Sequence, residues 1–477
     1  MSRPRVVIVG AGLGGSVLAH ALCETHDVVV IERASDGVAL PPIRDVGHPA
    51  ITDPHCSVGL GGSTKLWHNG LIEIHEDVFQ QHWPMSNSEL EPHYREAFRL
   101  LSKADLDTVR RATNELGDRY RSIGVPCEPY PGLYYPQWPL NMWEALKLGQ
   151  RVTVVRGEVI DFLVDDNTQM RGVTVRTAAG TEQVTAETVV LAAGGLGTPC
   201  LLQILAKRTD LPALALAGCF YEDHPMGFVG EIEVSAPIYR LWNFRPKGDK
   251  GNLRHPLVLQ RDGLHVSFQL RPAAAVSRSS RRERVGTVLN ELRRRWWNPA
   301  LWLGVLRHRD DVLDILSFKF GVHLPTPHFT LLLVAQMPCS SERSVWVDDQ
   351  THTAMIPICR RWVLTPAYFD LLQRCTDDLL ALLKPITRSA RLFDGWQKEV
   401  RSGAHHSGTA RMSSSPQHGV CDVNTKVHGA RNLYVCDGSL IPASGVSNTG
   451  LTIAALALRL AAHLKATAAP AVAGMKA

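Results

Sequence analysis

The chain has 477 residues, of which 45% are hydrophobic and 20% are charged, and its formal net charge is +5. This composition is ordinary for a globular protein, and the length favours two large domains over three average ones. The small net charge excludes a typical nucleic-acid-binding protein.

The ten cysteines show no C-x-x-C spacing, which predicts reduced thiols and neither disulfides nor a zinc site. The histidines that recur at regular spacing lack acidic or cysteine partners, so we expect no metal site; they are His55, His68, His75 and His82. We see no secretory signal and no apolar stretch of 18 uncharged residues, and therefore expect a cytoplasmic protein.

Residues 4–32 have the pattern of a strand, a glycine-rich turn, a helix and a second strand. Gly10, Gly12 and Gly15 fit the G-x-G-x-x-G spacing, which provides a tight turn, backbone approach to a pyrophosphate and close packing of helix on strand. Glu32 ends the second strand, where a carboxylate can accept both ribose hydroxyls. The pattern predicts a dinucleotide-binding fold and does not separate FAD from NAD.

A second glycine-rich run, residues 57–68, places Gly61 and Gly62 directly before Ser63. Bare backbone N–H groups of this kind can line a phosphate or a flavin ring. Further along, residues 151–192 alternate apolar and polar side chains, which predicts strands.

Residues 278–295 contain seven arginines and two glutamates and are followed by Trp296, Trp297 and Trp302. One interpretation is a basic helix that lies on an anionic membrane. The other is a helical lid or docking face of the substrate domain, with its tryptophans packed inward. We favour the lid, because an apolar substrate vestibule needs such side chains.

The C-terminal part, residues 403–464, places His405 about forty residues before Asp437 and Asn448. An apolar strand at 433–436 precedes Asp437, and a helix is predicted over 450–464, capped by Ser447, Asn448 and Thr449. The Ala- and Pro-rich end from Thr467 is expected to be disordered.

Taken together, these segments resemble the glucose-methanol-choline (GMC) family of FAD oxidoreductases. The resemblance covers about half of the chain, is weak from 221 to 395, and rests on Gly61-Gly62-Ser63, Trp83-Pro84, Leu90 to Tyr94, residues 188–202 and the H-x-x-G-T motif of His405 to Thr409. It implies an α/β fold with a Rossmann-like, glutathione-reductase-like FAD-binding domain and an α+β substrate domain on an antiparallel sheet. The implied FAD-binding segments are 1–80, 140–220 and 396–477, with an insertion or lid at 81–139, a substrate-binding domain at 221–395 and a tail at 467–477.

The resemblance also implies roles for individual residues. His405 has the position of the catalytic base and Asn448 that of its partner, and the adjacent His406 should point away. The backbone of Val159 would contact adenine, and Asp437 would bind the ribityl chain or the pyrophosphate. The residues implied or predicted to bind the cofactor are Gly10, Gly12, Gly15, Glu32, Arg33, Gly61, Gly62, Ser63, Val159, Asp437, Asn448 and Thr449.

Two positions depart from the family pattern. Leu66 stands where some relatives carry a histidine that links FAD covalently, so we expect non-covalent FAD. Gly195 stands where relatives usually have Ser, Thr or Ala.

The resemblance implies oxidation of a CH–OH group of a sugar or natural-product alcohol, with hydride transfer to flavin N5 and His405 as general base. The electron acceptor would be O2, a quinone or another redox partner. Alternatives are a lyase or other non-redox enzyme that retains FAD as a scaffold, a membrane-associated dehydrogenase that reduces a quinone, and a non-catalytic flavin-binding protein. An aromatic hydroxylase is disfavoured, because the segment from Cys436 to Gly445 lacks the histidine of that class.

Overall fold

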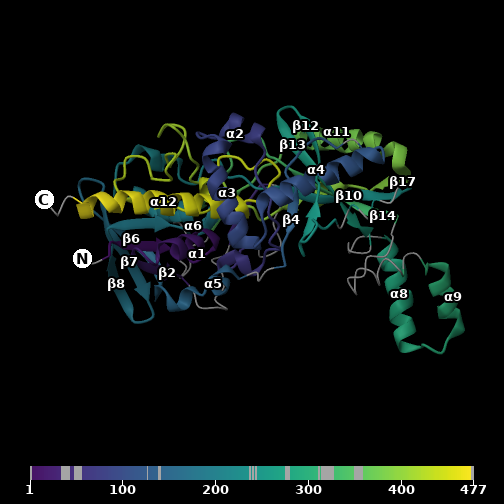
Figure 1. Cartoon of the computed structure of the whole chain (residues 1–477), viewed down its shortest axis with the longest axis horizontal. Coiled ribbons are helices and arrows are strands. Elements are labelled where there is room, and N and C mark those ends of the chain that lie inside the picture. Colours follow the sequence, from purple (N-terminus) through teal and green to yellow (C-terminus); the bar gives the residue numbers. More distant parts are fainter. Residues whose placement is uncertain are drawn as a thin grey trace.

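The structure is a computed structural model. It describes residues 3–33, 43–47, 56–125, 127–137, 141–235, 238, 241, 244–273, 280–309, 312, 327–348 and 358–473. Figure 1 shows an elongated molecule in which both termini lie at one end and a helical hairpin projects from the other.

A parallel sheet forms one half of the molecule. Its strand order is β19-β9-β1-β2-β5, and every neighbouring pair is parallel. The strands are short and almost wholly apolar, as expected for a parallel sheet with both faces covered. Their bounds are β1 Arg5–Val9, β2 Asp27–Glu32, β5 Thr153–Arg156, β9 Thr188–Leu191 and β19 Leu433–Val435.

Three helices accompany this sheet: α1 (Leu13–Leu22), α6 (Gly194–Ala206) and α12 (Gly450–Ala473). The long helix α12 packs along α1 and α3 (Asn87–Ser102), as Figure 1 shows. A three-stranded meander extends the same end of the molecule, with β6 Glu158–Val164, β7 Met170–Thr177 and β8 Gly180–Thr185.

An antiparallel sheet forms the other half, in the order β12-β13-β14-β10-β17, with β18 paired to β10. A parallel nucleotide sheet beside an antiparallel sheet confirms the fold class expected from the sequence. The bounds are β10 Pro225–Val234, β12 Leu257–Arg261, β13 Leu264–Pro272, β14 His328–Ala335, β17 Thr387–Leu392 and β18 Arg401–Ser402.

Smaller elements join the two halves. Strand β3 (Ile43–Val46) pairs with β16 (Ile358–Arg361), which pairs with β15 (Ser344–Val347), and β4 (Leu133–Tyr135) pairs with β11 (Asn252–Arg254). The other helices are α2 Glu76–His82, α4 Leu106–Ser122, α5 Met142–Ala145 and α11 Pro366–Leu383. The 3₁₀ turns are η1 Gly62–Lys65, η2 Leu148–Gln150, η3 Pro212–Leu216, η5 Lys384–Ile386, η6 Trp396–Glu399 and η7 Gly438–Leu440.

The parallel sheet draws its strands from all three predicted FAD-binding segments. The domain bounds themselves stay a prediction. The expected tail differs from the structure, because α12 continues past Thr467 to Ala473. Alanine is the best helix former, so an alanine-rich end propagates a helix that is already nucleated. Residues 474–477 lie outside the described residues.

The projecting hairpin consists of α8 (Ser280–Arg294) and α9 (Pro299–Arg307). Trp296 and Trp297 are 68% and 67% exposed and Trp302 is 50% exposed, so the inward-packed tryptophans of the lid interpretation are wrong. No helix in the described part of the chain is long and apolar enough to cross a membrane.

Candidate flavin and catalytic site

The turn between β1 and α1 uses its three glycines for three different reasons. A Cβ at Gly10, whose φ is 109°, would lie 2.4 Å from the carbonyl oxygen of Ala192. A Cβ at Gly15 would lie 2.1 Å from the carbonyl oxygen of Gly10. At Gly12 a Cβ would meet only Ala192 O, at 3.9 Å, among the residues that the structure describes, so these residues leave the space in front of Gly12 open.

The second glycine run packs directly on this turn. The Gly61 amide donates to Ala11 O at 2.9 Å, and a Cβ at Gly62 would lie 2.9 Å from Gly12 Cα. Glu32 ties the two loops together, because its carboxylate accepts from the Ala11 amide at 2.8 Å and from the Gly59 amide at 3.1 Å. Each of these oxygens retains a lone pair, so Glu32 can still accept ribose hydroxyls. The Ser63 hydroxyl accepts from the backbone of Ser57 at 3.3 Å.

Two helix N-termini face the same edge of the parallel sheet. Strands β1 and β9 are neighbours, and α1 and α6 begin just beyond their carboxyl ends. Helix α1 has no side-chain cap and no acidic residue in its first turn. At the start of α6, by contrast, the Gly194 amide donates to the Asp437 carboxylate at 2.8 Å. The uncapped start of α1 fits the phosphates of a dinucleotide such as FAD.

The predicted adenosine end contains Arg33 and Val159. Arg33 pairs with Glu158 at 2.9 Å between the charged atoms. Val159 is buried in β6 opposite Val175, and a β-bulge follows it before Asp161. A bulge disrupts the ladder locally and frees backbone groups, which fits the predicted backbone contact.

Asp437 joins its own loop at the end of β19 to the start of α6. One of its carboxylate oxygens accepts from the amide and the hydroxyl of Ser439, at 2.9 and 2.6 Å. The other accepts from the Gly194 amide at 2.8 Å and the Thr198 hydroxyl at 2.5 Å. Burial nevertheless raises the pKa of Asp437. With four protein donors on its carboxylate, Asp437 holds α6 in place, and its predicted contact with the cofactor remains a prediction.

The departure at Gly195 has a packing reason. A Cβ there would lie 2.3 Å from the carbonyl oxygen of His406, and the Gly195 carbonyl accepts from the Thr409 hydroxyl at 2.8 Å. The start of α6 and the H-x-x-G-T motif are therefore in direct contact.

His405 is half-buried at the other side of this motif. Its Nδ1 lies 2.8 Å from Nδ1 of His224, and Nε2 of His224 lies 2.9 Å from the hydroxyl oxygen of Ser444. Burial is the main cause that lowers the pKa of both rings, to about 3 for His224. Both imidazoles are thus neutral at pH 7, and one of the two Nδ1 atoms must donate to the other.

Asp223 lies next to His224 and is fully buried. Its carboxylate accepts from the backbone amides of His224 and His405, at 2.7 and 3.0 Å. The hydroxyl of Tyr221 donates to it at 3.0 Å, and the hydroxyl of Ser402 donates as well. Burial would raise the pKa of Asp223, but the hydrogen bond from His406 and these other donors hold it far below its usual range.

His406 pairs with this carboxylate. Its Nδ1 lies 3.3 Å from Asp223 Oδ2 and 2.8 Å from the hydroxyl of Tyr221. Burial would lower the pKa of His406, but the nearby Cys56 sulfur and the Asp223 carboxylate raise it to about 9. Its Nε2 makes no hydrogen bond of good geometry to a described residue, although the Cys56 sulfur is close enough to influence the ring. The two adjacent histidines therefore differ, because His405 is neutral and His406 is cationic at pH 7.

Asn448 lies on the loop that also carries Ser444. Its side-chain amide donates to the Gly70 carbonyl at 3.1 Å, and the ring of Trp67 lies against Gly450. Thr449 O accepts the first α-helical bond of α12, from Ile453 N at 2.9 Å. Ser447 does not cap this helix as expected, because its hydroxyl donates to Glu73 O at 2.8 Å.

A histidine cluster occurs behind the same loop. His75, Asp77 and His265 place one ligand-type atom each within 4.8 Å of one another, although the sequence showed no partner for His75. The Gln260 amide donates to Asp77 at 2.8 Å and lies 2.7 Å from His265 Nε2, so hydrogen bonds satisfy these groups. We assign no metal here.

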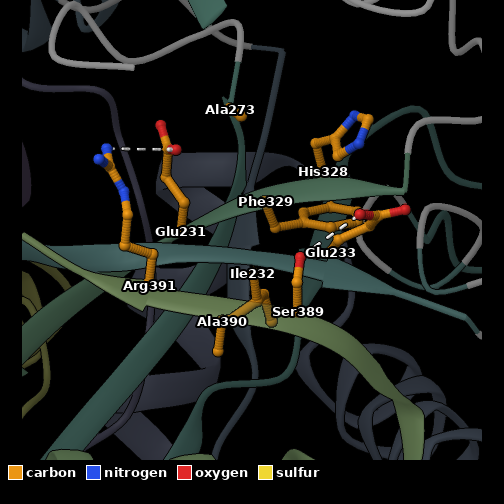
Figure 2. Close-up of a pocket in the computed structure, with 9 residues that line it drawn as sticks. All are labelled: Glu231, Ile232, Glu233, Ala273, His328, Phe329, Ser389, Ala390 and Arg391. Atoms are coloured by element: carbon orange, nitrogen blue, oxygen red, sulfur yellow. Dashed lines mark hydrogen bonds and ion pairs between the residues drawn. The ribbon is translucent and has the colours of Figure 1, made fainter. Parts of the chain in front are cut away.

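A small pocket at the far end of β10 is lined by β10, β14 and β17 (Figure 2). Glu231 and Arg391 form a long ion pair in it at 4.0 Å, and the Ser389 hydroxyl donates to Glu233 at 3.4 Å. His405 is not part of this pocket, and we give the pocket no role in flavin chemistry.

Sequence reasoning missed Tyr221, Asp223, His224 and Ser444. Asp223 and His224 lie at the start of the region where the family resemblance is weak. An acidic residue next to a histidine, directly before an apolar strand, was the available signal.

The comparisons with known proteins agree with this geometry. A GMC oxidoreductase family model matches residues 374–457, and a model of the NAD(P)-binding Rossmann-like domain matches residues 8–68. The chain is 41% identical over 71 residues to 6'''-hydroxyparomomycin C oxidase of Streptomyces lividus, and 43% identical over 63 residues to cholesterol oxidase of Acinetobacter baumannii. These segments cover 14% and 13% of this chain and only 13% and 11% of the two relatives.

The fold is similar to that of pyridoxine 4-oxidase from Mesorbium loti, with a TM-score of 0.61 and 17% identity over 97% of this chain and 99% of that one. It is also similar to a formate oxidase from Aspergillus oryzae, with a TM-score of 0.58 and 18% identity over 98% and 99% of the two chains. The chain thus matches a Rossmann-like domain model near its start and the GMC oxidoreductase model over residues 374–457, and its fold is similar to that of FAD-dependent oxidases.

Proposed function

We propose that this protein oxidises a CH–OH group by hydride transfer to FAD, with His405 as the general base. The observation that carries this proposal is the chain of contacts from His405 through His224 to Ser444. When bound, FAD supplies the hydride acceptor.

The contact chain can fix the tautomer of His405. If His405 Nδ1–H donates to His224 Nδ1, then His224 Nε2–H donates to the Ser444 oxygen. His405 Nε2 is then left with a lone pair that can take the proton of an alcohol. The lowered pKa of His405 supports this role, because the ring stays neutral at working pH.

Asn448 would hold the alcohol oxygen. His224 connects His405 to the Ser444 loop, and Asn448 lies four residues further along this loop. The hydrogen bond from Asn448 to Gly70 fixes the side chain beside the second glycine run.

We propose that FAD is bound non-covalently, because Leu66 stands at the linking position and is half exposed. The substrate is proposed to be a small alcohol, of the sugar or natural-product type. The names of the oxidases to which the chain is similar favour O2 as the electron acceptor.

Anaerobic stopped-flow reduction of the bound flavin tests the proposal, after a screen of alcohols has found one that bleaches it. Removal of a positioned base typically costs about 10² to 10⁴ in rate, so His405→Ala should retain FAD and be reduced that much more slowly. Asn448→Ala should show a smaller loss, since the amide orients the alcohol without taking its proton.

His428→Ala is the matched control, because this half-buried histidine lies 3.1 Å from Ser413 O and is not part of the His405 contacts; the variant should leave the rate unchanged. His406→Ala is unsuitable as a control, because it would leave the Asp223 carboxylate without its cationic partner. If His405→Ala is reduced as fast as the wild type, His405 is not the base. If no alcohol bleaches the flavin without air, the chain is a non-redox enzyme or a binding protein.

A further inference from the structure

The hairpin of α8 and α9 is inserted between two paired strands of the antiparallel sheet. Strand β13 ends at Pro272 opposite Phe329 of β14, and the hairpin lies between them in the sequence. It projects away from the body of the protein (Figure 1). The two helices touch each other where Gly304 of α9 faces Val288 of α8, since a Cβ at Gly304 would lie 3.4 Å from Val288.

The outer surface of the hairpin is apolar. None of the nine residues of α9, all of them described, is buried. Leu301, Gly304 and Val305 are half-buried on the side that faces α8. The exposed apolar side chains, which we call the hairpin patch, are Trp296 (68%), Trp297 (67%), Trp302 (50%), Leu303 (66%) and Leu306 (67%).

The turn of the hairpin is ordered by its own contacts. The indole N–H of Trp302 donates to Trp296 O at 2.8 Å, and the rings of Trp296 and Trp297 stack edge to face, 6.2 Å between centroids. Asn298 caps α9 by accepting from the Ala300 amide at 3.0 Å. The tryptophans are thus fixed in an exposed arrangement before any partner binds.

The hairpin is also strongly basic. Residues 280–309 contain eight arginines and two glutamates, a net charge of +6, whereas the whole chain carries +5. The remainder of the chain is therefore nearly neutral, and the excess positive charge of the protein belongs to residues 280–309. Arg293, Arg294 and Arg295 directly precede Trp296.

The distance from His405 argues against a lid. His224, which contacts His405, immediately precedes β10, and β10 pairs at its other end with the start of β14. The base of the hairpin adjoins that far end, where Ala273 and His328 line the pocket of Figure 2. Ten strand residues at about 3.3 Å each separate the two ends by about 30 Å.

We propose that the α8–α9 hairpin docks this protein on an anionic membrane surface. Tryptophan and leucine side chains favour the boundary between headgroups and acyl chains, and arginines on the same element bind anionic headgroups. Charge complementarity identifies the partner, because an exposed apolar patch that directly follows the exposed Arg293, Arg294 and Arg295 matches a negatively charged bilayer. The attachment is peripheral, since α9 has only nine residues. The inference is independent of the reaction proposed above.

Co-sedimentation of the flavin-bound protein with lipid vesicles tests this docking. The protein should bind vesicles of phosphatidylcholine mixed with phosphatidylglycerol, bind pure phosphatidylcholine vesicles far more weakly, and dissociate as salt is raised. Replacement of Arg293, Arg294 and Arg295 by Gln should weaken binding to the mixed vesicles about 10²-fold, at roughly tenfold for each 1.4 kcal/mol and about 1 kcal/mol for each arginine.

A triple variant with Trp296→Ser, Trp297→Ser and Trp302→Ser should lose vesicle binding. Leu382→Ser with Val363→Ser is the matched control, because these two exposed apolar residues (37% and 39%) lie outside the hairpin, and it should bind like the wild type. Unchanged flavin content shows that each variant is folded.

Three outcomes would overturn the proposal. One is that the wild-type protein does not bind anionic vesicles. A second is a wild-type dimer in solution that the tryptophan variant converts to a monomer, without vesicle binding, since the patch would then join two copies. The third is equal binding by the tryptophan variant and the control.

Discussion

The buried pair of Asp223 and His406 makes a prediction about stability that can be worked out from the structure. Asp223→Asn keeps the shape of the side chain and removes the negative charge that Nδ1 of His406 faces at 3.3 Å. In the wild type the pKa of His406 is raised from 6.5 to about 9, although burial opposes the effect of Cys56 and Asp223. In the variant the effect of Asp223 is gone while that of Cys56 remains, so the pKa of His406 falls below its wild-type value.

The sign of the pH dependence follows from the linkage between proton binding and folding. A histidine whose pKa is raised in the folded state stabilises it fully below the unfolded pKa, and this stabilisation is lost as the pH rises through the folded pKa. For His406 this loss occurs between pH 6.5 and about pH 9. At about 1.4 kcal/mol per pKa unit, the stabilisation lost is about 3 kcal/mol. Because Cys56 supplies part of the raised pKa, Asp223→Asn should cost more at pH 6.5 than at pH 9.5, by less than this loss of about 3 kcal/mol.

Urea unfolding at the two pH values, with equal added FAD, measures this difference. Buried thiols and tyrosines also titrate in the window, but they are the same in both proteins and cancel in the comparison. Asp165→Asn is the matched control. The Asp165 carboxylate also accepts backbone amides, from Asn167 and Gln169, and it forms no ion pair with a histidine among the described residues, so the cost of this variant should not change with pH. An equal cost of Asp223→Asn at pH 6.5 and 9.5 would refute the reasoning. If Asp223→Asn does not fold, His406→Gln takes its place. Between pH 6.5 and pH 9.5 its free energy of unfolding should fall by about 3 kcal/mol less than that of the wild type.

Three more predictions concern the cofactor and the base. Because Leu66 replaces the linking histidine, acid precipitation should release free FAD into the supernatant, and flavin that stays with the pellet would contradict this. The space at Gly12 is open until a pyrophosphate fills it, so Gly12→Val should give folded apoprotein. In Gly15→Ala the new Cβ would lie 2.1 Å from Gly10 O, so this variant should be insoluble. The flavin absorbance and the yield of soluble protein measure these two results. The rate of flavin reduction should be constant above pH 6.5 and fall only at lower pH, because burial lowers the pKa of His405, and a midpoint above 6.5 in stopped flow would count against it as the base.

Local patterns in the sequence predicted the glycine turn between β1 and α1. Gly10, Gly12 and Gly15 occupy the turn that their spacing indicated, because the constraint there is set by neighbouring backbone only. The helix beginning at Gly450 was also correct, since its apolar spacing reflects a face buried along α1.

The sequence could not predict features that depend on contacts between distant segments. Asp223 meets His405 and His406 only because β10 and β18 pair, and the residues involved are about 180 positions apart. The different charges of the two adjacent histidines follow from those contacts and not from the H-x-x-G-T motif. The exposure of Trp296 and Trp297 likewise depends on where the sheet places the hairpin.

The order of strands in the parallel sheet has a consequence for biosynthesis. Strand β9 is covered on one edge by β1 and on the other by β19, whose residues Leu433–Val435 are synthesised more than 240 positions later. Until the ribosome has released that segment, the nascent chain carries an apolar strand with an unpaired edge, which is a template for aggregation. Non-local pairing of this kind is slow, so an early translation stop before residue 433 leaves an aggregation-prone chain that depends on chaperones.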